Sequence, residues 1–279
     1  FRSLINKLNI SKVGFIIISK SGYTPETLSQ FTSIIELLKS NKNMEKLLKE
    51  CVVITENTNN PLKKIADKYG CHLLYHDINI GGRFSVFSNV GMLPAFIAGL
   101  DVIKIREGAK EIIDKTLNNL FKEHLFGGQI ITHLYFKKII NLNVLITYSD
   151  ALYYFGKWFL QLWAESIGKK MQGITPIHSI GTTDQHSQQQ LYLEGPKDKF
   201  FSFITKDHRK LGLKMNEKIL NEIDIKYLAG KTMGDLMYAE QQATLNTFIN
   251  EKLPVREIHC NCINEYSIGQ LMAYFMMET

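Results

Sequence analysis

The sequence contains few cysteines, four in 279 residues, and they are not arranged as a metal site or a disulfide framework requires. Each lies in or beside a short apolar run, as buried free thiols of a reducing compartment usually do. Cys260 and Cys262 are separated by one residue, but no second pair lies at ligand spacing. This pattern predicts a cytoplasmic protein without a bound metal. The other two cysteines are Cys51 and Cys71.

Long apolar runs and concentrated basic runs are also missing. The longest apolar stretch, Ser85–Ile103, is interrupted by glycine, proline and aspartate, so we expect no membrane span. The net charge is +6, but the lysines are scattered among acidic residues, which argues against a nucleic-acid-binding surface. A modest positive excess suits a small anionic substrate, although it is equally common in proteins without such a partner.

What the sequence does contain is the composition of a globular protein, 45% hydrophobic and 22% charged, in a chain long enough for two domains. Short apolar runs alternate with amphipathic segments of helix length, which predicts an α/β fold with parallel sheets covered by helices on both faces. Two such arrays predict two subdomains, residues 1–125 and 126–279. The predicted strands are Val13–Ser19, Cys51–Thr55, Cys71–His76, Val144–Ser149, Phe200–Thr205 and Arg256–Ile263, and the predicted helices are Pro25–Ser40, Asn60–Tyr69, Ala151–Lys169 and Thr232–Phe248.

The segment SKSGYTPET follows the first predicted strand and opens the first predicted helix. We expect Thr24 as the N-cap and Pro25 at the first helical position. Backbone N–H groups and the helix dipole favour an anion at such a terminus, and Gly22 permits a tight turn. The segment therefore predicts a phosphate site, with an ordinary Ser/Thr-rich turn as the alternative. The predicted phosphate ligands are Ser19, Lys20, Ser21, Thr24 and Thr27.

Two further segments carry candidate catalytic residues. Arg83 follows two glycines after the third predicted strand, where an arginine can stabilise a negative charge that develops during a reaction. Gln161 and Glu165 lie four residues apart on one helix face. Trp158 and Leu162 are expected to flank Glu165 with apolar surface, which would raise the pKa of its carboxyl group and suit a general base. The alternatives are a structural ion pair for Arg83 and a solvated helix face for Glu165.

The octet GTTDQHSQ, which starts at Gly181, is a polar run that we expect to form a loop between helical segments. His186 within it can act as an acid or a base near neutral pH. A lone histidine is more often a surface or core residue, but the surrounding octet favours a functional role.

These four segments resemble the glucose-6-phosphate isomerase family, within the superfamily of sugar isomerase (SIS) domains. SKSGYTPET is similar to the family's phosphate segment, and GGRFS is similar to its GGRxS motif. QLWAESIGK is similar to the helix that ends with the catalytic glutamate, and GTTDQHSQ to the G-x-x-x-Q-H loop. The motifs occur in the family's order and cover nearly the whole chain, so the resemblance implies two SIS-type subdomains.

The resemblance implies an aldose–ketose isomerase that interconverts glucose 6-phosphate and fructose 6-phosphate through a cis-enediol, in glycolysis and gluconeogenesis. It implies that Glu165 carries the proton, that Arg83 steadies the enediolate and that His186 assists ring opening. Gln161 would touch the sugar, and the five residues of the phosphate segment would hold its phosphate. The family needs no cofactor and forms cytoplasmic homodimers in which the histidine reaches the partner's active site.

The chain departs from the family at both ends. A glycine-serine loop normally lies well before the phosphate segment, but this chain begins eighteen residues before Ser19. A catalytic lysine normally follows the last helix, whereas Lys252 is the last lysine here. We therefore expect an internal portion of an isomerase, truncated at both ends. A non-catalytic phosphosugar-binding SIS module and an inactive shortened member are the alternatives. An amidating SIS enzyme would need a nucleophilic cysteine near the N-terminus, which is absent.

Overall fold

The computed structural model describes residues 2–39 and 42–279, and the chain folds as two compact units, Phe1–Val102 and Ile103–Thr279. Each unit is built around its own parallel sheet flanked by helices, which confirms the predicted α/β class. Within the described ranges, every helix is too short or too polar to span a bilayer.

The first unit contains a parallel sheet with the strand order β1-β2-β3. All three strands were predicted from short apolar runs, of which the first is rich in β-branched residues. Ser40, at the expected end of the first long helix, lies outside the described residues. The strands are β1 (Ile16–Ile18), β2 (Val52–Glu56) and β3 (His72–His76), and the helices are α1 (Arg2–Ile5), α2 (Pro25–Leu38), α3 (Met44–Lys49), α4 (Pro61–Tyr69) and α5 (Asn89–Ile97), with 3-10 turns η1 (Ile10–Lys12) and η2 (Gly82–Phe87).

The core of the first unit lies between this sheet and the apolar stripes of its helices. Phe31 and Leu38 lie two turns apart on α2, and both are buried. They pack in one cluster with Val53 of β2 and Leu62 of α4. This packing holds the carboxyl ends of the strands, and the loops that follow them, in fixed positions.

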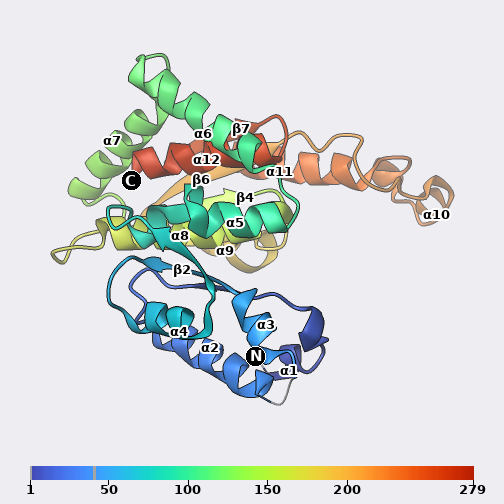
Figure 1. Cartoon of the computed structure of the whole chain (residues 1–279). Coiled ribbons are helices and arrows are strands. Elements are labelled where there is room, and N and C mark those ends of the chain that lie inside the picture. The colour runs from blue at the N-terminus through green and yellow to red at the C-terminus, as the bar shows by residue number, and fades with distance from the viewer. Residues whose placement is uncertain (1, 40–41) are drawn as a thin grey trace. The chain divides into compact units, whose positions relative to one another are not determined.

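The second unit contains a parallel sheet with the strand order β5-β4-β6-β7. Residues 207–232, which include α10, extend away from this sheet (Figure 1). The strands are β4 (Leu142–Thr147), β5 (Thr175–Ile180), β6 (Lys199–Lys206) and β7 (Val255–Cys260), and the helices are α6 (Val102–Leu117), α7 (Glu123–Phe136), α8 (Tyr153–Ile167), α9 (Gln185–Glu194), α10 (Glu217–Glu222), α11 (Met233–Asn250) and α12 (Glu265–Glu278), with 3-10 turns η3 (Asp150–Leu152) and η4 (Lys226–Leu228).

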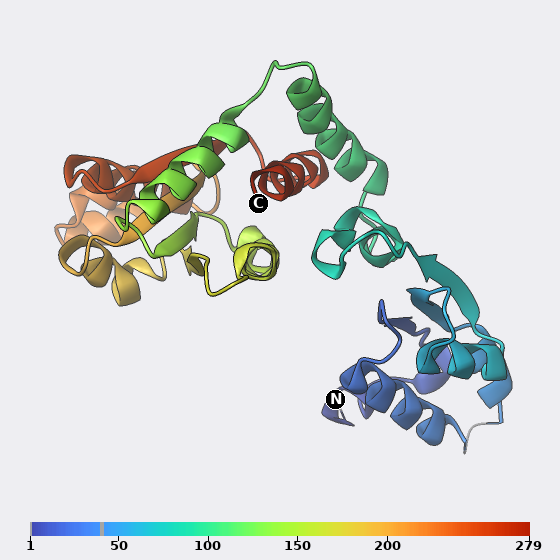
Figure 2. The same cartoon turned by 90° about the vertical axis from the view of Figure 1, so that its left-hand side faces the viewer.

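Helix α6 belongs to the second unit because it packs directly on α12 (Figure 2). Gly108 of α6 lies against the backbone carbonyl of Tyr266, and Gly269 of α12 lies against the carbonyl of Ile105. The boundary between the two compact units therefore precedes the division after residue 125 that the sequence suggested.

One expectation about the second unit is wrong. We expected the octet at Gly181 to lie between helical segments, but it follows strand β5, and its second half forms the first turn of α9. The strand was overlooked because Pro176 and His178 interrupt the apolar residues of TPIHSI. Proline is tolerated here because β5 lies at an edge of the sheet.

Candidate functional site

The predicted phosphate segment is a tight loop between β1 and α2. Ser19 Oγ lies 2.7 Å from Thr24 Oγ1 and accepts a hydrogen bond of 3.1 Å from the amide of Gly22. Thr24 is the N-cap residue of α2, but its hydroxyl binds Ser19 and not a backbone amide of the helix. The N-terminal amides of a 14-residue helix thus meet a cluster of hydroxyls, an arrangement suited to an anion. Ser21 is exposed beside this cluster, and Thr27 Oγ1 lies 3.5 Å from the carbonyl of Ile18.

Gly22 and Asn60 lock this loop in place. Gly22 has a φ of +70°, and a Cβ atom there would lie 1.9 Å from Asn60 Oδ1. Asn60 is fully buried, caps α4 through a 2.9 Å bond from the amide of Lys63, and donates to the carbonyl of Glu56 at 3.1 Å. Glycine is required at position 22 for two reasons, namely its left-handed backbone and the close approach of Asn60.

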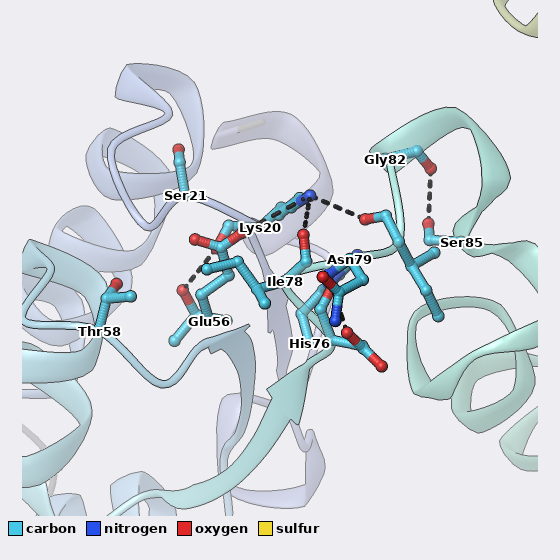
Figure 3. Close-up of polar contacts among 12 residues, drawn as sticks. Lys20, Ser21, Glu56, Thr58, His76, Ile78, Asn79, Gly82 and Ser85 are labelled. Atoms are coloured by element: carbon cyan, nitrogen blue, oxygen red, sulfur yellow. Dashed lines mark hydrogen bonds and ion pairs between the residues drawn. The ribbon is translucent and has the colours of Figure 1, made fainter.

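The side chain of Lys20 forms hydrogen bonds with backbone carbonyls of a distant loop of the same unit (Figure 3). Its ammonium donates to the carbonyls of Ile78 at 3.2 Å and Ile80 at 2.8 Å, and Nζ lies 3.6 Å from the Glu56 carboxylate. Two of the three N–H donors of the ammonium thus bind backbone carbonyls, and the Glu56 carboxylate forms an ion pair with it. Lys20 therefore ties the phosphate loop to the segment that leads into Gly81 and Gly82.

Arg83 lies on η2, a 3-10 turn that follows this segment. It is half-buried, and its guanidinium stands 4.9 Å from the centre of the Phe84 ring. The turn is closed by Ser85 Oγ, which donates to the carbonyl of Gly82 at 2.6 Å. The carboxyl ends of β1, β2 and β3 thus carry the hydroxyl cluster, Lys20 and the arginine turn on one side of the first unit.

In the second unit, Gln161 and Glu165 lie together on α8. Gln161 Nε2 donates to Glu165 Oε1 at 3.0 Å, and both side chains are exposed. Of the two apolar residues expected to flank Glu165, Leu162 is fully buried in the core and Trp158 is half-buried. Glu165 thus lies on an exposed helix face that also presents an amide.

His186 lies on the first turn of α9 and is exposed. The loop before it is held by Asp184, whose Oδ2 accepts from the amide of Ile180 at 2.7 Å and whose Oδ1 accepts from Ser187 Oγ at 3.1 Å. Gly181 lies flat on the buried ring of Tyr148, where a Cβ atom would come within 2.4 Å of Cε1. Burial raises the pKa of Tyr148 to about 12, so this residue is a neutral phenol at physiological pH.

Glu165 and His186 lie at opposite ends of their sheet. Gly156 near the start of α8 packs on His178 in the carboxyl half of β5, where a Cβ atom would come within 2.2 Å of the imidazole. Because β5 is parallel to β4, α8 must return towards the amino ends of the strands. Glu165 is nine residues beyond Gly156 on this return, about 13 Å along the axis. His186, in contrast, lies past the carboxyl end of β5.

His178 itself is a partly buried histidine of the second unit's core. Its Nε2 lies 3.0 Å from Thr147 Oγ1, and its ring lies beside Tyr153. Burial lowers the pKa of His178, and the positive charge of Lys157 adds to that shift, against the opposing effect of Asp184. Its contacts explain why glycine occupies position 156.

Across residues 2–39 and 42–279, no three His, Cys, Asp or Glu side chains gather closely enough to hold a metal ion.

A family model for phosphoglucose isomerase matches residues 1–278. The chain belongs to the phosphoglucose isomerase family. Glucose-6-phosphate isomerase from Carboxydothermus hydrogenoformans is 32% identical over 98% of this chain, and that from Methanocaldococcus jannaschii is 35% identical over 99%. The chain spans 61% of the length of the first and 67% of the second.

Two solved structures extend the phosphoglucose isomerase likeness to the fold. A hypothetical protein from Thermus thermophilus superposes with a TM-score of 0.89 at 29% identity, over 99% of this chain and 67% of that one. A glucose-6-phosphate isomerase from Chlamydia trachomatis superposes with a TM-score of 0.79 at 20% identity, over 99% of this chain and 56% of that one. The second match speaks for the fold alone.

Sequence reasoning missed the residues that support the site of this family member. The sequence places Asn60 at a helix start, and the Asn-Pro pair was the signal for its capping role, but nothing local indicated that it would pack on Gly22. Gln185 and Tyr148 were not singled out either, although Gln185 Nε2 donates to Tyr148 Oη at 2.7 Å. Their 37-residue separation leaves no local pattern to find.

Proposed function

We propose that this chain carries the sugar-phosphate isomerase chemistry of its family, the interconversion of glucose 6-phosphate and fructose 6-phosphate in glycolysis and gluconeogenesis. The observation that carries the proposal is the family match over residues 1–278, together with a hydroxyl-lined helix N-terminus at the phosphate segment. An anion gains there from both the helix dipole and the donors of the loop.

The phosphate of the substrate is proposed to bind at this loop. The hydroxyls donate to its oxygens, and Lys20 contributes its charge from its place between two backbone carbonyls. Binding energy from the non-reacting phosphate then orients the carbons that exchange a proton. The proposed phosphate ligands are Ser19, Lys20, Ser21, Thr24 and Thr27.

The isomerisation is proposed to follow a cis-enediol route. His186 assists ring opening, after which Glu165 removes the proton from C2 of the aldose and returns it to C1 of the ketose. Arg83 stabilises the negative charge that develops on the enediolate oxygen. Gln161, which already binds Glu165, touches the sugar. No metal and no organic cofactor takes part in this route.

We further propose a homodimer in which each active site takes His186 from the partner subunit. Within one protomer, Glu165 lies on the part of α8 that runs towards the amino ends of the strands, whereas His186 lies past the carboxyl end of β5. Two groups so far apart cannot serve the same sugar, which supports a shared site. Four free cysteines, of which Cys262 alone is exposed, agree with a cytoplasmic enzyme. Neither nucleic acid nor membrane is a proposed partner.

The test is conversion of fructose 6-phosphate to glucose 6-phosphate by this chain, beside Glu165→Gln. We expect turnover in the parent chain and a loss of at least about a thousandfold in the variant, because the base is removed while the shape is kept. Glu217→Gln, on the exposed helix α10, is the matched control and should retain full turnover. Binding of the sugar phosphate without any turnover would favour a phosphosugar-binding module instead.

A further inference from the structure

Gln185 is the residue next to His186, but its side chain points into the second unit. Its Nε2 donates to Tyr148 Oη at 2.7 Å, lies 3.4 Å from the backbone carbonyl of Glu240, and contacts Thr244 Oγ1. Tyr148 directly follows β4, and the other two partners belong to α11. One amide group therefore joins the first turn of α9 to two other elements.

The partners of Gln185 are themselves held firmly. Gln241 on α11 is fully buried and clamps the end of β6, since its Oε1 accepts from the amide of Lys206 at 3.2 Å and its Nε2 donates to the carbonyl of Lys206 at 3.1 Å. This clamp fixes α11 against the sheet, and with it Glu240 and Thr244. Tyr148 is only 1% exposed, and its amide donates to the carbonyl of Ile204 at 3.2 Å.

Three residues hold the loop that leads to His186 in place. Gly181 rests on the Tyr148 ring, and Asp184 binds the backbone of Ile180. One residue before His186, the side chain of Gln185 binds Tyr148 and helix α11. The anchored backbone fixes the direction in which the Cα–Cβ bond of His186 projects, which is one condition for precise proton transfer.

We propose that Gln185 is a positioning residue for His186, acting through its hydrogen bonds to Tyr148 and Thr244. The proposal rests on the proposed function, in which His186 assists opening of the sugar ring. Gln185 touches no substrate in this scheme. It determines where the neighbouring imidazole projects, so its loss should lower the rate of the chemical step while leaving phosphate binding intact.

The experiment compares Gln185→Leu with Gln190→Leu, an exposed glutamine on the same helix. We would measure kcat and KM for fructose 6-phosphate, and record the imidazole NMR signals of His186, assigned with His186→Asn. For Gln185→Leu we expect kcat to fall about tenfold or more with KM changed less than about twofold, since small misplacements of a catalytic group cost this much. The His186 signals should shift and broaden. Gln190→Leu should change none of these quantities.

A Gln185→Leu protein with wild-type kcat and unchanged His186 signals would overturn the proposal. If Gln185→Leu does not fold, Gln185→Glu takes its place, because the carboxylate keeps the shape and can accept from both hydroxyls; we expect it to fold and to show a smaller fall in kcat. If the parent chain has no turnover, the proposed function fails, but the NMR comparison still decides whether Gln185 positions His186.

Discussion

At the scale of single residues, Lys20 joins two loops that lie far apart in the sequence. Its ammonium binds carbonyls 58 and 60 residues away and stands beside Glu56. Lys20→Met keeps the length of the side chain and removes the donors. We expect it to lower the free energy of unfolding of the first unit by about 1–2 kcal/mol, since hydrogen bonds from charged donors at partly exposed sites are worth about this much. Urea unfolding measures the change.

The matched control is Lys46→Met, which removes an ion pair to Glu50 at 3.9 Å on the exposed face of α3. Exposed pairs of this kind contribute less than about 0.5 kcal/mol. Hydrogen exchange across residues 77–83 gives a second measurement, because the loop loses its anchor only in Lys20→Met. If the two variants show the same loss of stability and the same hydrogen exchange across residues 77–83, Lys20 does not link the two loops.

The buried side chain of His124 is expected to make the free energy of unfolding depend on pH. It is fully buried between the rings of Phe121 and Tyr274, and within the described part of the chain neither ring nitrogen has a hydrogen-bond partner. Burial lowers the pKa of His124, against a smaller opposing effect of Glu123. As the pH falls below about 6.5, the unfolded chain takes up a proton that folded His124 does not, so the free energy of unfolding falls.

His124→Phe should remove this part of the pH dependence. Free energies of unfolding, measured with urea from pH 7.5 to pH 5.5, should fall less steeply in His124→Phe than in the parent, by a slope of up to about 1.4 kcal/mol per pH unit. The exposed His72 provides the control, and His72→Asn should keep the parent's slope. Parallel pH profiles for parent and His124→Phe would show that another group carries the acid sensitivity.

The predictability of the site differs residue by residue. The phosphate loop could be predicted because its hydroxyls, Gly22 and Pro25 are neighbours in the chain and act through one helix end. The partners of Lys20 and Gln185 could not, because they are brought together only when the sheets form. The exposed position of Glu165 was the alternative that the sequence left open, because the helical pattern does not show whether Leu162 enters the core.

At the scale of elements, α6 and α12 cross at two glycines. A Cβ atom at Gly269 would lie 1.9 Å from the carbonyl oxygen of Ile105, and one at Gly108 would lie 2.0 Å from that of Tyr266. Backbone atoms cannot move aside as a flexible side chain can. We expect Gly269→Ala to destabilise the second unit by about 2 kcal/mol in urea unfolding, after the gain of about 1 kcal/mol in helix propensity.

Gly14→Ala is the control for this helix contact, because no atom lies within 4 Å of the added Cβ. It should change the stability by less than about 0.5 kcal/mol. The double variant Gly108→Ala, Gly269→Ala should cost less than the sum of its parts, since the first alanine already separates the helices. Strict additivity would contradict a single shared contact.

The hydrophobic pattern of the sequence predicted some of the strands and helices but not others. Strands with β-branched runs, such as Val52–Glu56 and Leu142–Thr147, were predicted because hydrophobic pattern and secondary structure agree there. Strand β5 was not, because its residues are set by its edge position and by the packing of His178 on Gly156, neither of which is a local property. Helices α6 and α7 were not predicted for a related reason. Each packs on α12, which is distant in the sequence, so no local pattern marks their buried faces.

At the scale of the whole molecule, a shared active site can be tested by mixing two inactive chains. In a dimer of one Glu165→Gln chain and one His186→Asn chain, the proposed arrangement gives one site both substitutions and the other site both native residues. Random pairing makes half of the dimers mixed, and each mixed dimer has one native site of two, so activity should return to about a quarter of the parent value.

The measurement is isomerase activity after co-expression of the two variants, with each variant alone at the same total concentration as the control. Recovery requires that Glu165 and His186 of different chains meet at one sugar. If both residues instead served the same protomer's site, every site in the mixture would carry one substitution and the activity would stay at the level of the single variants. In one chain, Glu165 and His186 lie at opposite ends of β5, a strand of six residues and thus about 20 Å long. We therefore expect recovery.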